Sequence, residues 1–536
     1  MMTGNLFVKT RDGTILSADL YLNPKEEKLP VLLMRTAYGK EIASTPVYAH
    51  PTWYVNQGFH VVIQDVRGTG DSDGYFDPVI NEANDGFDTI EFIANQLWCD
   101  GKVIMYGFSY QGLVQYAAAS VHPPHLFAIC PAMSGTDFKK HFIFRNDILK
   151  LYDSLLWGLQ LDSIRAKKSG NYQLYNSIYL LTRSFSVIDS RLHDLEWLIN
   201  FNPDSLFLEW IDHRDDNDYW NLRTIDLSNI SVPVLTITGW FDTYTEGSII
   251  SALKLYESNS SCQELLIGPW SHLNWHNKQL TSNIYNHEND ALRVDPYQID
   301  WIVKLLKWNN LSKSLQVNCY CLNDGWLFKE LNQVKTYDLI LWPSQSDVSS
   351  QSVGFLSKKI PLVFCSDYLV HDPWRPAQGS VRGIGSSSTG GDRHLVDLRS
   401  DVFVYDSSPL EDDIVIFGAP TLHFQISSFI KNVDLHCCLS SVSSSNEVIP
   451  FASGCIRSFS DQNNHIFILD FVSIKIINSQ KIRLSISCSA FPLYELNTSD
   501  SFCTRSNTPA DYRTITIQLT YGSSTFVKLP IMEDYN

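Results

Sequence analysis

The chain contains, at residues 101–112, the stretch Gly101-Lys-Val-Ile-Met-Tyr-Gly-Phe-Ser-Tyr-Gln-Gly112. An apolar run of strand length comes first, Gly107 interrupts it, and residues 113–119 predict a helix. A serine between glycines at a strand-to-helix turn is typical of a nucleophile elbow, which holds a hydroxyl above the end of a sheet. The usual G-x-S-x-G spacing is not met, because Gly112 follows Ser109 by three residues instead of two. Taken alone, the stretch fits an ordinary glycine-flanked turn better than an elbow.

Length and composition narrow the classes of protein to consider. A chain of 536 residues exceeds what one hydrophobic core usually holds, so we expect two or three domains. Hydrophobic residues at 44% and charged residues at 18% are typical of a globular protein. A net charge of −17 disfavours nucleic acid and anionic membranes as partners, since both attract clustered Lys and Arg. We therefore expect a small-molecule partner, and the oligomeric state stays open, homo-oligomers included.

Cysteine usage and the first residues predict a cytoplasmic protein. The 11 cysteines are scattered and include no C-x-x-C pair, so reduced thiols are expected rather than disulfides or a zinc site. The chain begins directly with strand and turn patterning and shows no secretory signal. No run approaches the roughly 18–20 apolar residues of a membrane span. We expect neither a metal nor another cofactor.

Strands and helices alternate through the first part of the chain. Residues 5–22 predict a hairpin around Asp12-Gly13, and buried strands are expected at 30–35, 59–65 and 102–106. Residues 84–97 carry apolar side chains at helical spacing. This alternation is typical of a mostly parallel sheet with helices on both faces, the α/β class.

The pattern changes twice further along. Residues 135–222 are aromatic-rich with apolar positions three and four apart, which predicts a helical insertion before the sheet resumes at 233–239 and 264–268. After a linker predicted at 342–350, short β-rich runs indicate a sandwich. The expected domains are the α/β domain at 1–134 and 225–335, the helical cap at 135–224, and the C-terminal β domain at 336–536.

Three polar residues at predicted strand ends fit a catalytic triad. A serine hydroxyl needs a base to take its proton, and the base needs an acid to fix its tautomer. In an elbow-type fold the chain order is Ser, Asp or Glu, then His. Asp242 follows the strand at 233–239, and His272 follows the strand at 264–268. Because the carboxyl ends of parallel strands share one edge, we expect Ser109, Asp242 and His272 to meet there.

An acyl-transfer site also needs donors for the developing oxyanion. The backbone N–H after the nucleophile, that of Tyr110, is one candidate. Tyr38, in the loop after the first buried strand, offers a phenol O–H as the second, because a phenol stays protonated at neutral pH. An aromatic residue packed at an interface is the alternative for Tyr38.

Five motifs resemble a known family, the CocE/NonD serine hydrolases, which are related to X-prolyl dipeptidyl peptidases and α-amino acid ester hydrolases. The motifs are Arg35-Thr-Ala-Tyr-Gly-Lys40, Gln64-Asp-Val-Arg-Gly-Thr-Gly-Asp-Ser-Asp-Gly74, Gly107-Phe-Ser-Tyr-Gln-Gly112, Gly239-Trp-Phe-Asp242 and Gly268-Pro-Trp-Ser-His272. The family's elbow is G-x-S-Y-x-G, which accounts for the shifted glycine. The resemblance continues through Tyr405-Asp-Ser-Ser-Pro-Leu410, Gly418-Ala-Pro420 and Gly454-Cys-Ile-Arg457.

The resemblance implies an α/β-hydrolase domain with an inserted helical cap and a C-terminal jelly roll. That jelly roll is similar to carbohydrate-binding (galactose-binding-like) sandwiches, but in the family it supports the active site. The resemblance also implies Ser109 as nucleophile, His272 as base and Asp242 as its orienter. Tyr38 and the Tyr110 amide are implied as the oxyanion hole.

The substrate is less well determined than the chemistry. The α-amino acid ester hydrolases carry extra acidic residues just after the triad aspartate, whereas residues 243–245 here are Thr, Tyr and Thr, although Glu246 is near. An esterase with an apolar acyl pocket therefore fits better, with Tyr244 and Trp157 as candidate pocket residues. For Trp157 a role in the core is the alternative. Arg67 and Asp65 are expected to brace their loop by pairing with each other.

We therefore expect a metal-independent serine hydrolase that cleaves carboxylic esters, or amides, through an acyl-enzyme. Within enzymes, the alternative is an X-Pro dipeptidyl peptidase or an acylase acting on amides. From a different class, the alternative is a non-catalytic scaffold that binds ligands with its C-terminal sandwich. The complete set of Ser, Asp and His speaks against the scaffold.

Overall fold

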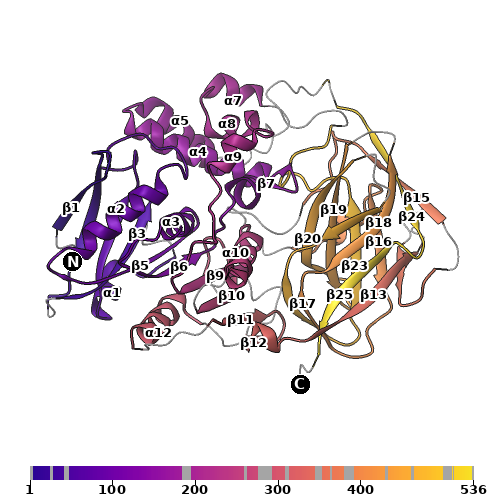
Figure 1. Ribbon diagram of the computed structural model, residues 1–536. Coiled ribbons are helices and arrows are strands. Elements are labelled where there is room, and N and C mark those ends of the chain that lie inside the picture. The colour runs from indigo at the N-terminus through magenta and orange to yellow at the C-terminus, as the bar shows by residue number, and fades with distance from the viewer. Residues whose placement is uncertain are drawn as a thin grey trace.

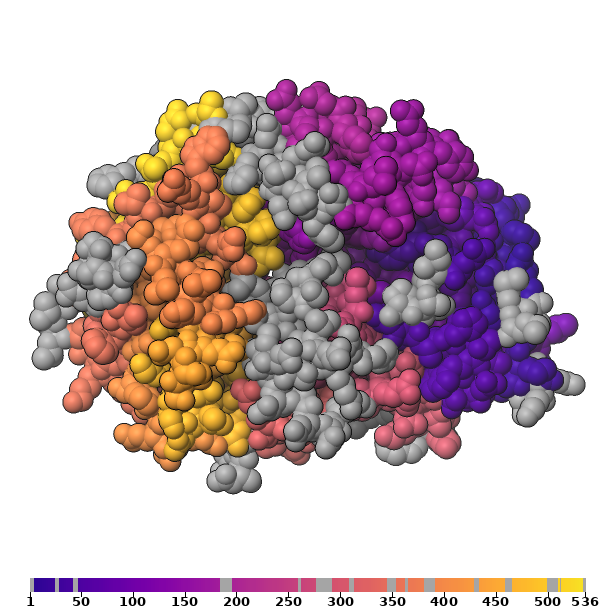
Figure 2. Space-filling view, turned by 180° about the vertical axis from the view of Figure 1, so that it is seen from behind, coloured from indigo at the N-terminus to yellow at the C-terminus, as the bar shows by residue number. Residues whose placement is uncertain are grey.

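The protein, described by a computed structural model, has an α/β part and a β-rich part that lie side by side (Figures 1 and 2). The structure describes residues 4–24, 28–41, 47–183, 195–258, 262–275, 292–307, 313–344, 353–361, 365–379, 391–428, 432–459, 464–498, 510 and 512–533. The helices inserted in the chain between strands β6 (Leu126–Ala132) and β9 (Val234–Phe241) form a layer at the top of the α/β part in Figure 1. This layer extends toward the β-rich part.

A ten-stranded mixed sheet forms the centre of the α/β part. Its spatial order is β1-β2-β4-β3-β5-β6-β9-β10-β11-β12. The strands are β1 (Gly4–Lys9), β2 (Ile15–Tyr21), β3 (Leu29–Thr36), β4 (His60–Asp65), β5 (Cys99–Phe108), β6 (Leu126–Ala132), β9 (Val234–Phe241), β10 (Gln263–Ser271), β11 (Leu315–Cys321) and β12 (Gly325–Glu330). Neighbours from β4 to β11 run parallel, while the edge pairs β1–β2, β2–β4 and β11–β12 are antiparallel.

Helices cover both faces of this sheet, as the near-continuous apolar strands require. The helices are α1 (Pro51–Asn56), α2 (Glu82–Ala94), α3 (Tyr110–Ala119), α10 (Thr245–Glu257) and α12 (Val294–Lys307). On β3, Val31 and Leu33 belong to the buried cluster that includes α2 and α3. Leu32 and Met34, on the opposite face, belong to the cluster that includes α1 and α12. The predicted α/β class is confirmed.

Inserted helices occupy the chain between β6 and β9. Their elements are η1 (Phe138–Ile143), β7 (Phe144–Arg145), β8 (Ile148–Leu149), α4 (Leu151–Lys168), α5 (Tyr172–Arg183), α7 (Glu196–Phe201), α8 (Leu206–Asp212) and α9 (Asn217–Asn221). Phe138 and three tryptophans from this segment pack together: Phe138 contacts Trp157, Trp210 and Trp220 with ring centroids 5.6–6.1 Å apart. Aromatic residues of the segment that the sequence showed to be aromatic-rich thus pack together in the core of the cap. Residues 184–194 of the expected cap lie outside the described residues.

A largely antiparallel β domain follows. Its strands are β13 (Thr336–Ser344), β14 (Gly354–Ser357), β15 (Cys365–His371), β16 (Val402–Ser407), β17 (Ile414–Gly418), β18 (Thr421–Ser428), β19 (Asn432–Val442), β20 (Val448–Phe459), β21 (Asn464–Ile468), β22 (Val472–Ile476), β23 (Lys481–Ser487), β24 (Ile515–Tyr521) and β25 (Phe526–Met532), with the short helix α13 (His394–Asp397). Residues 342–344 continue β13, so the linker prediction is wrong for them; residues 345–350 lie outside the described residues. Among the helices of the described residues, none is long and apolar enough to cross a membrane.

Glu495 of the β domain joins that domain to the cap. Its carboxylate accepts hydrogen bonds from the Leu149 amide (3.0 Å) and from the side chains of Arg214 (2.6 Å) and Arg457 (3.0 Å). Burial opposes its ionisation, but the two guanidinium groups outweigh burial and hold the pKa of Glu495 at about 2. The contact therefore depends on a buried, ionised carboxylate.

Replacing Glu495 by Gln should destabilise the protein by on the order of 3 kcal/mol, because buried Arg214 and Arg457 lose the counter-charge that Glu495 provides, although Asp434 still pairs with Arg457. A depressed carboxyl pKa stabilises the fold above its ordinary value of 4.5, and that contribution is lost as the pH falls toward 2. Scanning calorimetry should therefore find a lower Tm for Glu495→Gln at pH 7 and a smaller difference from wild type below pH 4.5. The same change at exposed Glu447 is the control, and equal Tm values for wild type and Glu495→Gln at pH 7 would contradict the assignment.

Candidate active site

Ser109 occupies a strained turn between β5 and α3. Its φ of 61° and ψ of −127° are rare for a residue with a side chain, as expected at a nucleophile elbow. A Cβ on Gly107, which has φ of 143°, would lie 2.6 Å from the Cβ of Gln111. A Cβ on Gly112 would lie 2.6 Å from the Cβ of Ser134, just beyond β6. Both glycines are therefore required, the second because α3 packs closely on the chain after β6.

A buried polar network holds the residue after the serine. The Tyr110 hydroxyl donates to Glu82 at 2.9 Å and accepts from the Val79 amide at 2.9 Å. Glu82 in turn pairs with Arg35 at 2.8 Å. Burial raises the pKa of Glu82, and Arg35 opposes that rise. The Tyr110 side chain thus fixes the first turn of α3, whose leading amides have no partner within the helix.

Asp242 and His272 form a buried hydrogen-bonded pair. Oδ2 of Asp242 lies 2.5 Å from Nδ1 of His272, and Oδ1 accepts from the Tyr244 amide at 2.7 Å. Asp242 is fully buried, and the His272 side chain is nearly so. The carboxylate thus holds one ring nitrogen and leaves Nε2 as the nitrogen that can exchange a proton elsewhere.

The three predicted triad residues share one edge of the sheet. Ser109, Asp242 and His272 each come directly after the last residue of a parallel strand, namely β5, β9 and β10. The His272 ring lies 5.5 Å from the ring of Phe108, the residue before the serine, and 5.1 Å from the ring of Tyr244. The imidazole therefore lies beside the elbow, positioned by a carboxylate and two aromatic rings.

Tyr38 reaches the same place from the loop after β3. Its hydroxyl accepts a hydrogen bond from Nε1 of Trp157 at 3.0 Å. Burial raises the pKa of Tyr38 to about 12, so the phenol remains protonated near neutral pH. Because β3 and β5 are parallel neighbours, Tyr38 follows its strand at the same edge of the sheet as Ser109.

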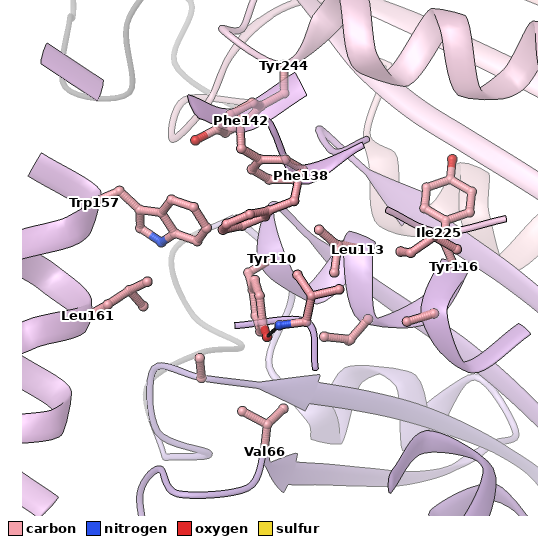
Figure 3. Packing of buried hydrophobic residues seen from close by; sticks show 14 of the residues in the cluster. Val66, Tyr110, Leu113, Tyr116, Phe138, Phe142, Trp157, Leu161, Ile225 and Tyr244 are labelled. Carbon is pink, nitrogen blue, oxygen red and sulfur yellow. Dashed lines mark hydrogen bonds between the residues drawn. The ribbon is translucent and has the colours of Figure 1, made fainter. Parts of the chain in front are cut away.

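Tyr244 and Trp157 are both buried in the hydrophobic cluster that also holds Phe142 and Tyr110 (Figure 3). Phe142 links them, with ring centroids 4.7 Å from Tyr244 and 5.7 Å from Trp157. Trp157 also contacts the ring of Tyr110. The hydrogen bond from Trp157 to Tyr38 was not predicted, because nothing in the sequence aligns a cap helix with the loop after β3.

The loop after β4, which contains Arg67, was expected to be held by an ion pair between Arg67 and Asp65, but its contacts differ. Asp65 accepts hydrogen bonds from the backbone amides of Lys40 (2.7 Å) and Asp71 (3.0 Å). Arg67 instead pairs with Asp85 at 2.6 Å and Asp12 at 2.7 Å. The predicted Arg67–Asp65 pair is wrong, because the Asp65 carboxylate is already held by the backbone of its own and the preceding loop. The sequence also did not predict that Glu82 and Arg35 support the Tyr110 side chain.

Comparison with known proteins finds a family model that matches the part of the chain carrying the candidate triad. Residues 12–274 match the family model described as X-Pro dipeptidyl-peptidase (S15 family). Over 497 residues the chain is 24% identical to cocaine esterase of Rhodococcus sp. (strain MB1 Bresler), covering 85% of this chain and 83% of that protein.

Solved structures with the same fold extend over nearly the whole chain. An aminopeptidase from a marine sediment archaeon (Thaumarchaeota archaeon) matches with a TM-score of 0.81 at 17% identity, covering 99% of this chain and 96% of its own. An α-amino acid ester hydrolase matches with a TM-score of 0.73 at 20% identity, covering 98% and 96%. At these identities the structures establish the fold.

Proposed function

The chain belongs to the S15/CocE family of hydrolases, which act on esters or amides, and we propose that it cleaves carboxylic esters through an acyl-enzyme formed on Ser109. The observation that carries this proposal is the buried His272–Asp242 pair beside the strained serine elbow. The predicted resemblance to the CocE/NonD family is confirmed.

Each step of the proposed reaction is assigned to a named residue. His272 Nε2 takes the Ser109 proton as the oxygen attacks the ester carbonyl, and the resulting imidazolium gives that proton to the departing alcohol. Water then attacks the acyl-enzyme with His272 again as base, which releases the acid and restores the serine. The Asp242 carboxylate accepts the Nδ1–H of His272 and stabilises the imidazolium during both acylation and deacylation.

The oxyanion is proposed to bind between the Tyr38 hydroxyl and the Tyr110 amide. Trp157 Nε1 is a donor only, so its hydrogen bond occupies a lone pair of the Tyr38 oxygen and not the phenol proton. The phenol proton is then available to the negative oxygen that forms during attack. Trp157 is on this account a positioning residue as well as a wall of the acyl pocket, with Tyr244 as the other wall.

Tyr38→Phe should lower kcat by about 10²-fold with KM little changed, the size of effect seen when one oxyanion donor is lost. The phenol proton interacts with charge that exists only in the transition state, so ground-state binding should be spared. Steady-state kinetics on an aryl ester measure this, with Tyr337→Phe on the exposed strand β13 as the control. A loss confined to KM would remove Tyr38 from the oxyanion hole.

A substrate panel separates ester hydrolysis from the alternatives. Aryl esters, X-Pro anilides and β-lactam side-chain amides present the same carbonyl chemistry with different leaving groups and acyl parts. We expect the highest kcat/KM for the esters. A preference for X-Pro anilides would instead identify a dipeptidyl peptidase, and a preference for the side-chain amides an acylase.

A further inference from the structure

A small cavity lies close to Asp242 of the proposed triad. It is formed where the cap meets the loop after Asp242 and the β domain. Its volume is about 40 Å³. Since one water molecule needs at least roughly 10–15 Å³, the cavity can hold a few water molecules or one small polar group. Its lining includes the charged side chains of Arg145, Lys150, Asp153, Glu246 and Asp470, together with hydroxyl groups such as that of Thr243. The lining is therefore far more polar than the apolar acyl pocket expected from the sequence.

Lys150 connects this cavity to the catalytic residues. The Lys150 side chain is buried, and one of its three N–H groups donates to the His141 carbonyl oxygen at 2.7 Å. Its ammonium lies 5.6 Å from the centre of the Tyr244 ring, the same ring that contacts His272 at 5.1 Å. A single aromatic side chain thus separates the cavity's ammonium from the proposed catalytic base.

Arg145 contributes a donor that lacks an acceptor. It is 7% exposed, and its Nε and Nη1 atoms lie 3.0 Å from Glu246 and Asp470, respectively. Within the described part of the chain, however, its Nη2 atom has no hydrogen-bond partner. A buried donor left without an acceptor is unfavourable, so this atom favours a molecule in the cavity that offers an oxygen.

The charges around the cavity favour an uncharged oxygen-bearing group over an anion. The lining holds two cationic and three acidic side chains, which leave a formal excess of one negative charge. An anion would be repelled by that excess, whereas an uncharged group would not. A carboxamide carries both a carbonyl oxygen for Lys150 and Arg145 and N–H groups for a carboxylate such as Asp153, which also accepts from Thr243 at 2.7 Å.

We propose that this cavity is a substrate subsite that holds an uncharged carboxamide at the far end of the acyl group, with Lys150 as its specificity-determining donor. The inference rests on the proposed ester hydrolysis at Ser109. It narrows the substrate class to esters whose acyl chain ends in an amide.

Matched methyl esters test the subsite. Each ω-carbamoyl ester with an acyl backbone of four to six carbons is compared with its isopropyl isostere and with the corresponding half-ester carboxylate. Wild-type kcat/KM should favour the carboxamide over the isostere by roughly 10-fold to 100-fold at one chain length or more, the size expected of a hydrogen bond to a charged group. Equal rates at every length, or preference for the carboxylate, would overturn the carboxamide subsite while leaving ester hydrolysis intact.

Variants assign the preference to the cavity. Lys150→Met should reduce the carboxamide-to-isostere ratio at least tenfold, and the isosteric change Thr243→Val should reduce it less. Lys167→Met, an exposed lysine of the same helix α4, should keep the wild-type ratio. Activities are normalised to the fraction of protein labelled by a fluorophosphonate, so misfolded enzyme does not enter the ratio. An unchanged ratio in both cavity variants would contradict the role of Lys150, and failure of wild type to cleave any of the esters would overturn the ester-hydrolase proposal and this inference together.

Discussion

Ser109→Ala should lower kcat by roughly 10⁵–10⁶-fold and abolish labelling by a fluorophosphonate probe. Without the hydroxyl no acyl-enzyme forms, and His272 and Asp242 have no nucleophile to activate. The residual rate over water would come from the oxyanion donors and substrate binding alone. Labelling of wild type and variant at equal concentration, followed by mass spectrometry of the modified peptide, measures the effect.

A neighbouring serine provides the control for this prediction. Ser120 lies at the other end of α3, where its hydroxyl donates to the Ala117 carbonyl oxygen. Ser120→Ala should keep both the labelling and the wild-type kcat. Equal labelling of wild type and Ser109→Ala would remove Ser109 as the nucleophile, and an unlabelled wild type would favour the non-catalytic scaffold.

Local pattern was sufficient to predict the sheet and the positions of the triad candidates. Buried parallel strands read as continuous apolar runs, and the residue after each run must lie at the carboxyl edge. Ser109, Asp242 and His272 each lie within four residues of the end of such a run, which is why three residues far apart in the chain could be predicted to meet. The resemblance to the family's elbow accounts for the shifted Gly112, and the structure adds a physical reason for the glycine, which is the close approach of Ser134.

Contacts between distant segments could not be predicted in the same way. The Trp157–Tyr38 hydrogen bond depends on where a cap helix lies over the sheet edge, and no periodicity encodes that placement. The Glu495 contact with Arg214 and Arg457 depends on how the β domain meets the cap. The cavity beside Lys150 likewise gathers side chains from the cap, from the chain after β9 and from the β domain. A single charged residue in a sequence does not reveal which distant charge will neutralise it.

Asp242→Asn should lower kcat by about 10⁴-fold while the protein remains folded and Ser109 remains in place. The carboxylate accepts the Nδ1–H of His272, and an amide nitrogen turned toward Nδ1 would instead favour the tautomer with its proton on Nε2. That tautomer cannot take the serine proton. Because Oδ1 also accepts from the Tyr244 amide, an asparagine that places its oxygen there turns its nitrogen toward the histidine.

The kinetic signature of Asp242→Asn distinguishes a lost orienter from a damaged fold. We expect kcat to fall with KM little changed and fluorophosphonate labelling to become slow but still confined to Ser109. Asp226→Asn, an exposed residue in the loop before β9, should behave as wild type. A kcat within tenfold of wild type would mean that His272 acts without Asp242, and the buried 2.5 Å contact would then be structural. A full loss of activity together with a lowered Tm would likewise count against the orienting role, because the pair would then be needed for folding.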